Sequence, residues 1–220
     1  MKPIYLVIQE GVVADMASVA LDGINAVVRE AQANVQVKNF GVWRHKDWID
    51  MNTGALLPYM SVDWYVEQGR KASRNKRQLY INPISYALIS EPWQKAQPHW
   101  DVTVMKDDLY DDGCNFIIGG AIPYHNFVIS TYRFRDLDEF WRRECFKTSV
   151  MHELGHVFGL PNDRQDGTIE QSLGGHCTNR CIMRQGLVVP RDWLVLTRDR
   201  LEHGSFCSTC LSELHQFFQS

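Results

Sequence analysis

The 220-residue sequence contains no long apolar run, no strong excess of either charge and no internal repeat. Its N-terminal apolar stretch, residues 4–8, is far shorter than the roughly 20 residues that cross a bilayer. No small-residue cleavage site follows this stretch, so we expect neither a membrane span nor a signal peptide. The formal net charge of −3 gives no argument for binding nucleic acid or a membrane surface. These absences predict a cytoplasmic globular protein without nucleic-acid or membrane partners, and we expect it to be a monomer.

The beginning of the chain alternates between strand and helix patterns. Residues 4–8 are apolar throughout, as in a strand that is buried on both faces. Apolar side chains then recur at helical spacing from about Ala14 to Ala33, and strand character returns between Val35 and Trp43. This strand–helix–strand order predicts a mixed α/β (α+β) layer architecture.

The middle of the chain predicts a short helix capped by Ser61, followed by several strands. Segments 79–81 and 87–89 flank Pro83 and indicate a broken strand, or a strand followed by a loop. Beta-branched and aromatic residues then predict strands at 102–105, 115–122 and 127–131.

A helix is predicted to begin at a capping residue, Asp136, and to end at Gly159. Within it, His152 and His156 are four residues apart, so both imidazoles project from the same helix face. That spacing allows both to bind one zinc ion at about 2.0–2.1 Å. Glu153 lies beside them as the candidate general base, which is the mechanism behind the H-E-x-x-H pattern. A chance match on a buried helix is the alternative explanation of these five residues alone.

The six cysteines are unevenly distributed, and four of them fall in two late pairs. Cys177 and Cys181 form a C-x3-C pair, and Cys207 and Cys210 form a C-x2-C pair. In a reducing compartment such pairs favour metal binding over disulfides, and two thiolate pairs can complete a tetrahedral four-cysteine site. The alternative is a redox-active motif at 207–210, which lacks the strand–motif–helix context of thioredoxins. We expect Cys114 and Cys145 to be free thiols.

The segment 175–183, Gly-His-Cys-Thr-Asn-Arg-Cys-Ile-Met, together with the late C-x-x-C pair, resembles the archaemetzincins, a family of metzincin metallopeptidases. The resemblance covers roughly residues 116–210. It implies a zincin-like metzincin fold, with a twisted mixed sheet packed on helices and a smaller C-terminal subdomain. It also implies that His176 is the third ligand of the catalytic zinc and that Met183 is the Met-turn residue. A second, structural zinc would be bound by the four late cysteines, Cys177, Cys181, Cys207 and Cys210.

The sequence departs from the family pattern in three places. First, residues 160–175 lie between Gly159 and His176, where the family has two residues. Second, the first cysteine pair is C-x3-C rather than C-x4-C. Third, the stretch from residue 183 to residue 207 is longer than usual in the family. Long surface insertions cost little loop entropy, so His176 can still close the site. Asp163 is the alternative third ligand, because some metzincins use an aspartate there. Asn162 and Asp166 are weaker alternatives, and the inserted segment is either a surface excursion or a lid.

We expect one catalytic domain built from two subdomains. Residues 1–159 would carry the sheet and the zinc-binding helix, and residues 160–220 the third ligand, the Met-turn and the four-cysteine site. The remaining histidines have no metal spacing, so we expect surface or structural roles for His45, His99, His125, His203 and His215.

The predicted function is a zinc-dependent metallopeptidase that acts on a peptide or protein. A zinc-activated water would attack the peptide bond with Glu153 as general base. The resemblance implies that the substrate lies extended along strand 115–121. Two alternatives stay open: a catalytically silent, zinc-stabilised binding or regulatory protein, and a zinc hydrolase that acts on a non-peptide amide.

Overall fold

The computed structural model describes residues 1–43, 50–162, 167–171 and 174–219. The chain forms two compact units, the first from residues 1–17 and 35–132 and the second from residues 18–34 and 133–220. A division into subdomains after residue 159 stays a prediction. Within the described residues, none of the helices combines the length and the apolar character that crossing a bilayer requires.

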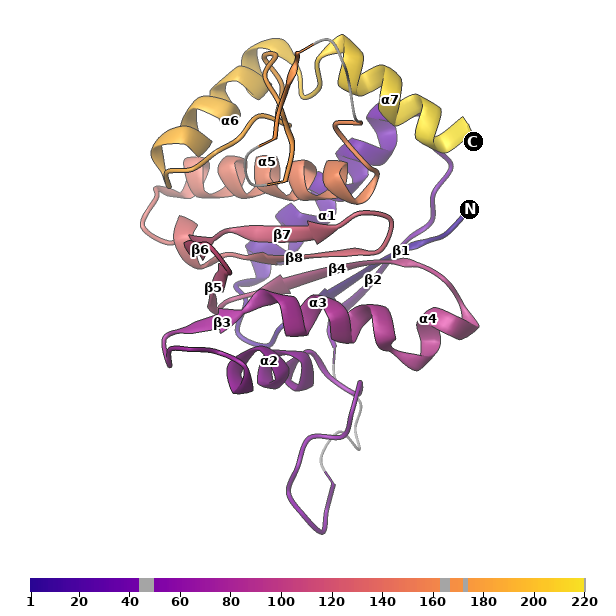
Figure 1. The fold of residues 1–220 in the computed structure, drawn as a ribbon, viewed down its shortest axis with the longest axis vertical. Helices are drawn as coiled ribbons and strands as arrows, with labels where there is room; N and C mark the ends of the chain where they lie inside the picture. Colours follow the sequence, from indigo (N-terminus) through magenta and orange to yellow (C-terminus); the bar gives the residue numbers. More distant parts are fainter. Residues whose placement is uncertain (44–49, 163–166, 172–173, 220) are drawn as a thin grey trace. The chain divides into compact units, whose positions relative to one another are not determined.

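The elements of the first unit alternate between strands and helices in its first part and end with five consecutive strands (Figure 1). They are β1 (Ile4–Ile8), the first residues of α1 (Ala14–Glu30), β2 (Val37–Val42), α2 (Val62–Lys71), β3 (Gln78–Tyr80), α3 (Ile81–Ser90), α4 (Pro92–Ala96), β4 (Trp100–Met105), β5 (Asp108–Asp111), β6 (Cys114–Ile117), β7 (Gly119–Ile122) and β8 (Asn126–Ser130).

The first unit is organised around a five-stranded mixed sheet in the order β2-β1-β4-β8-β7. The first four strands are parallel, whereas β7 pairs with β8 in the antiparallel direction and forms an edge. Strands β1, β4 and β8 are buried along their whole length, which is consistent with the continuous apolar sequence of β1. Strands β3, β5 and β6 form a separate small sheet. Helices α2 and α3 lie together on one face of the large sheet and share its apolar core.

The second unit is mainly helical. It contains the rest of α1, then α5 (Glu139–Val157), β9 (Ile169–Glu170), β10 (His176–Cys177), α6 (Arg191–His203) and α7 (Ser208–Gln219). Helix α5 is its buried centre, and the segment after α5 lies on the same side of this helix as α6 and α7 (Figure 1). Gly23 of α1 permits a close approach, because a Cβ there would lie 2.9 Å from Val150 Cγ1 of α5.

Most of the predicted elements are confirmed, including the strand–helix–strand start of the chain. Ser61 caps α2 as predicted, since its hydroxyl accepts the Trp64 backbone N–H at 3.3 Å. The prediction for segment 87–89 was wrong, because it lies within helix α3. Pro83 sits in the first turn of α3, where its missing N–H removes no helical hydrogen bond. The single strand predicted at 115–122 is divided into β6 and β7, which belong to different sheets.

Helix α5 begins two residues later than predicted and ends where predicted. Its N-cap is Asp138, whose Oδ1 accepts the Trp141 N–H at 3.0 Å, so the assignment of Asp136 as the cap was wrong. Gly159 follows the helix with a φ of 81°, which confirms the predicted left-handed termination. Helix α6 was not predicted at all.

Candidate metal centres

Two imidazoles meet on the buried face of α5. His152 and His156 are one helical turn apart, and their ring centroids are separated by 4.6 Å. Their Nε2 atoms face each other at 3.1 Å. Two nitrogens bound to one tetrahedral zinc at about 2.0–2.1 Å lie about 3.3 Å apart, so the observed separation fits a shared ion.

Backbone carbonyls fix the tautomer of both rings. His152 Nδ1 donates to the Ile182 carbonyl at 2.6 Å, and His156 Nδ1 donates to the Leu160 carbonyl at 2.7 Å. Because a carbonyl oxygen only accepts, the proton of each neutral ring lies on Nδ1 and the lone pair on Nε2. Two lone pairs at such a short distance repel each other, whereas a divalent cation between them would bind both. Histidines that bind a metal through one ring nitrogen commonly donate the other ring N–H to a backbone carbonyl, so this arrangement fits a metal site.

The third predicted histidine lies in the same place. His176 comes from β10, and its ring centroid is 5.3 Å from that of His152 and 5.0 Å from that of His156. One nitrogen from each of the three rings falls within 4.8 Å of the others. The structure therefore brings together the three residues that the resemblance implied as ligands of one ion.

The alternative third ligands are only partly visible. Asp163 and Asp166 lie outside the described residues. Asn162 is exposed, and its backbone N–H donates to Glu213 Oε2 of α7 at 3.3 Å. Among the described residues, His176 is thus the only proposed third ligand that lies beside His152 and His156, which we call the helix pair.

Burial controls the protonation of the site. Burial, and to a lesser degree the neighbouring imidazoles, lower the pKa of His152 well below its usual value and that of His156 to about 4. Neutral imidazole is the form that binds a metal. Burial raises the pKa of Glu153 to about 8, and a divalent cation beside this carboxyl would lower that pKa. Glu153 is buried next to the helix pair, at 6% exposure, which suits a base that acts only inside a closed site.

Met183 packs against α5 at Gly155. It is fully buried, and a Cβ added to Gly155 would collide with Met183 Sδ. Position 155 is therefore restricted to glycine by this contact rather than by helix propensity. The sulfur contacts the helix backbone at Gly155, and the assignment of Met183 as a Met-turn residue stays a prediction.

Gly155→Val is expected to lower the free energy of unfolding by about 1–3 kcal/mol, since overpacking a buried contact has that cost. Chemical denaturation measures it. In the double variant Gly155→Val with Met183→Ala, the space vacated by the sulfur should accept the new side chain. The double variant should therefore be more stable than the sum of the single changes predicts. Strict additivity would contradict the packing role of Met183.

The four late cysteines form a second cluster. One sulfur from each of Cys177, Cys181, Cys207 and Cys210 lies within 4.8 Å of the others, and within the described residues none of the four belongs to a disulfide. The Cys177 and Cys207 sulfurs are 3.8 Å apart. Two sulfurs at about 2.3 Å from a tetrahedral zinc are also about 3.8 Å apart, whereas a disulfide would need about 2.05 Å.

Hydrogen bonds surround these sulfurs as they would surround thiolates. The Cys207 backbone N–H donates to Cys181 Sγ at 3.4 Å, and the Cys210 N–H donates to Cys207 Sγ at 3.5 Å. The Asn179 side-chain amide donates to Cys207 Sγ at 3.7 Å. Donors aimed at sulfur favour its charged, metal-binding form, whereas the hydrogen bond with the Cys177 side chain and burial raise the pKa of the metal-free Cys181 thiol to about 12. The donor set and its spacing thus fit a four-cysteine metal site.

A third buried cluster in the first unit was not predicted. His99 Nε2 lies 3.1 Å from Glu91 Oε1 and 3.0 Å from Asp101 Oδ1, and its Nδ1 donates to the Gln97 carbonyl at 2.6 Å. The Tyr65 hydroxyl donates to the other Glu91 oxygen. Because the partners of Nε2 are carboxylates, a proton on this nitrogen explains the short separations without a metal. His99 is thus a satisfied structural histidine, as expected.

Burial lowers the affinity of His99 for a proton, but its hydrogen bonds to Asp101 and Glu91 outweigh this and raise its pKa to about 10. Because this value lies above the ordinary 6.5, the stability from His99 is fully present below about pH 6.5 and is lost as pH rises towards 10. A His99→Gln variant should therefore show a flatter decline of the free energy of unfolding over this range. Denaturation at a series of pH values tests this. The matched variant His125→Gln, at an exposed position, should keep the original slope.

The other histidines and cysteines stand apart from the two candidate centres. His215 Nε2 interacts with the Glu30 carbonyl at 2.9 Å, and His125 and His203 are exposed. His45 lies outside the described residues. Neither Cys114 nor Cys145 belongs to a metal-type cluster among the described residues.

Comparison with known proteins first identifies the fold of the chain. No family model matches the chain. A crystal structure described as a zinc-dependent peptidase from Methanocorpusculum labreanum superimposes with a TM-score of 0.51 at 18% identity, covering 96% of this chain and 99% of that chain. The chain therefore has the fold of a zinc-dependent peptidase.

Two further crystal structures, both of archaemetzincins, have a similar fold. The archaemetzincin of Methanopyrus kandleri matches with a TM-score of 0.57 at 22% identity, covering 100% of this chain and 96% of that chain. The archaemetzincin of Archaeoglobus fulgidus matches with a TM-score of 0.56 at 24% identity, covering 97% and 99%. At these identities the likeness concerns the fold.

Sequence similarity points to the same family. The chain is 37% identical to the archaemetzincin of Nanoarchaeum equitans over 81 residues, which is 37% of this chain and 36% of that protein. It is 33% identical to the archaemetzincin of Thermococcus kodakarensis over 117 residues, which is 49% of this chain and 54% of that protein. The matched region thus spans about a third to a half of these relatives. In fold and in sequence the chain is archaemetzincin-like.

Proposed function

We propose that the chain is a zinc-dependent metallopeptidase whose catalytic ion is bound by His152, His156 and His176. The observation that carries this proposal is the tautomeric state of the helix pair. The neutral imidazoles of His152, which is buried, and His156, which is partly buried, present Nε2 lone pairs to each other at 3.1 Å, and each Nδ1 donates to a backbone carbonyl. Three protein ligands would leave one position open, which distinguishes catalytic from structural zinc.

The metal ligands and Glu153 would have different roles in hydrolysis. Zinc bound at this site would lower the pKa of a water molecule towards about 7 and polarise the scissile carbonyl. Glu153 would accept the proton from the attacking water and then deliver it to the leaving amine. Its burial limits competition from bulk solvent, and its carboxylate follows His152 directly on a rigid helix, so its position needs no loop rearrangement.

We further propose one structural zinc at the four-cysteine cluster. The 3.8 Å sulfur–sulfur separation and the N–H donors aimed at Cys181 and Cys207 support it. One catalytic and one structural ion per chain is the resulting stoichiometry. A peptide or protein substrate follows from the proposed activity. Monomeric state and cytoplasmic location stay predictions from the sequence.

The test uses the purified full chain with a mixed peptide library and, in parallel, a panel of non-peptide amides. We expect peptide cleavage that is lost after treatment with a chelator and restored by zinc. Metal analysis of the same sample should give two zinc ions per chain. A protein that carries both ions but cleaves no peptide would be a zinc-stabilised binding protein, and cleavage confined to the non-peptide amides would make it another kind of hydrolase.

A further inference from the structure

The two candidate metal centres share a strand. His176 and Cys177 are the two residues of β10, and successive side chains of a strand point to opposite faces. His176 accordingly joins the helix pair, while the Cys177 sulfur lies 3.8 Å from that of Cys207. The third ligand of one centre and the first cysteine of the other are therefore adjacent in the chain and cannot move independently.

The short loop that follows His176, residues 177–183, contacts the histidine centre again at its end. Cys181 belongs to the cysteine cluster, and the next residue, Ile182, supplies the carbonyl that accepts the His152 Nδ1–H at 2.6 Å. Met183 then packs against Gly155, and its carbonyl accepts the Cys177 N–H at 2.9 Å. Loop 177–183 thus follows His176 directly and ends at two residues, Ile182 and Met183, that contact the helix carrying the other two histidines.

The backbone that leads into this loop has little regular structure of its own. Gly174 and Gly175 precede His176 with φ values of 104° and 79°, conformations that glycine adopts without strain. Strand β10 pairs with β9 over two residues only, and such a short pair is not stable by itself. The position of the His176 ring therefore depends strongly on how residues 177–183 are held.

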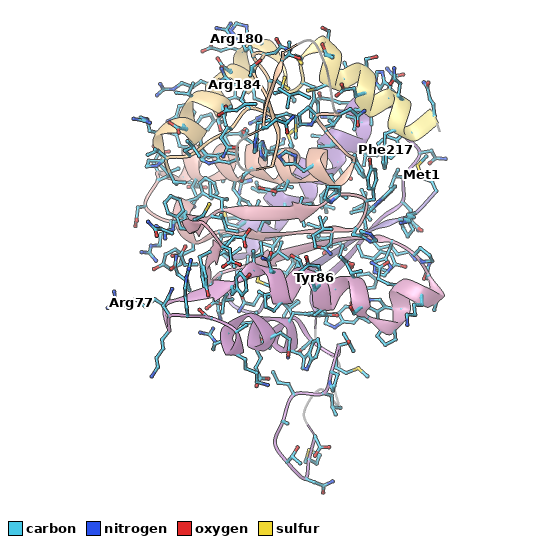
Figure 2. All side chains as sticks on the ribbon, viewed as in Figure 1. Met1, Arg77, Tyr86, Arg180, Arg184 and Phe217 are labelled. Carbon is cyan, nitrogen blue, oxygen red and sulfur yellow. The ribbon has the colours of Figure 1, made fainter. Side chains whose placement is uncertain are left out.

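The end of the loop has an additional, metal-independent anchor. Arg180 and Arg184, which are labelled in Figure 2, both form ion pairs with Asp199 of α6. The Ile182 N–H also donates to the Ser205 carbonyl at 2.9 Å. These contacts hold residues 180–184. The beginning of the loop is held by two backbone hydrogen bonds of 2.9 Å, from Cys177 N–H to the Met183 carbonyl and from Thr178 N–H to the Thr168 carbonyl, and its only side chain in the sulfur cluster is Cys177.

We propose that the two metal centres are energetically coupled through loop 177–183, so that metal at the four cysteines sets the affinity of the three-histidine centre for its own ion. This inference rests on the metal sites of the proposed function. Metal at the cysteines orders the loop, and the ordered loop delivers His176 and the Ile182 carbonyl to the helix pair. The cysteine centre fills first, and a chain without metal there retains only a weak two-histidine site.

The coupling is testable because it must be reciprocal. If metal at the cysteines strengthens binding at the histidines by some factor, metal at the histidines strengthens binding at the cysteines by the same factor. Cys207 and His156 are suitable positions for testing both directions, because each belongs to one centre and lies outside the segment 176–183. Replacing either one removes a ligand without altering the connecting loop.

Cobalt(II) replaces zinc as the probe, because thiolate ligands give it an intense near-ultraviolet charge-transfer band that imidazole ligands do not. In the metal-free full-length chain, the charge-transfer band should saturate before the weak visible bands of the histidine centre develop. In Cys207→Ser, cobalt affinity at the histidines should fall about 10–100-fold, the range for loss of supporting interactions around a metal. In His156→Ala, cobalt affinity at the cysteines should fall by a matching factor.

Cys114→Ser, at a half-buried thiol outside both centres, is the matched control and should leave both affinities unchanged. Equal histidine-centre affinity with and without metal at the cysteines, or filling of the histidines first, would overturn the proposal. If Cys207→Ser does not fold, as judged by circular dichroism, the filling order in the unmodified chain still decides. These measurements require no substrate, so absence of peptidase activity would contradict the proposed function and leave the coupling result intact.

Discussion

Glu153→Gln is expected to lower kcat/KM for peptide hydrolysis by about 10²–10⁴-fold, the usual contribution of a general acid–base group. Glutamine preserves the shape of the buried side chain but cannot accept a proton from water. The three imidazoles are unchanged, so the zinc content should remain at two ions per chain. Steady-state kinetics together with metal analysis of the same sample measure both quantities.

Glu139→Gln is the matched control for this change. Glu139 is the first residue of the same helix and is exposed, so its replacement should leave kcat/KM and zinc content nearly unchanged. If Glu153→Gln cleaved peptides at the original rate, Glu153 would have no role as the base. If Glu153→Gln lost zinc as well as activity, the Glu153 carboxylate would instead be needed for zinc binding.

The second large effect is expected for His176→Ala. Without its third ligand the helix pair cannot retain a tightly bound ion, so zinc should fall from two ions per chain to one, with loss of peptide cleavage. The cysteine cluster keeps all four sulfurs in this variant and should account for the remaining ion. Metal analysis after dialysis against a weak chelator measures the loss.

His125→Ala provides the control, because His125 is exposed and outside every metal-type cluster in the described part of the chain. It should retain two ions and full cleavage. Retention of both ions by His176→Ala would instead indicate that another residue closes the site. Asp163→Ala would then be expected to lose the catalytic ion.

The sequence predicted the local part of the site well. The four-residue spacing of His152 and His156 already determines that both rings lie on one helix face, because helical periodicity is a local property. The left-handed turn at Gly159 was also predictable, because glycine after a helix end is likewise a local sequence signal. The third histidine was different. Residues 160–175 separate Gly159 from His176, so no periodicity links this residue to the helix, and only resemblance to a family identified it.

Non-local and backbone interactions were not predictable. The carbonyls of Leu160 and Ile182 fix both tautomers, yet a backbone oxygen has no sequence signature. The buried network around His99 joins residues from α2, the α3–α4 junction and β4, with no regular spacing. Helix α3 was missed because Pro83 suggested a break, whereas a proline in the first turn is compatible with a helix.

In the proposed catalytic centre, three histidines from two distant segments bind one ion. Anomalous scattering at the zinc absorption edge, measured on crystals of the zinc-loaded chain, tests this arrangement most directly. We predict two peaks, one surrounded by four cysteine sulfurs and the other about 2.0–2.1 Å from Nε2 of His152 and His156 and from a ring nitrogen of His176. A peak at the cysteines alone, or a second peak without His176 among its ligands, would contradict the account.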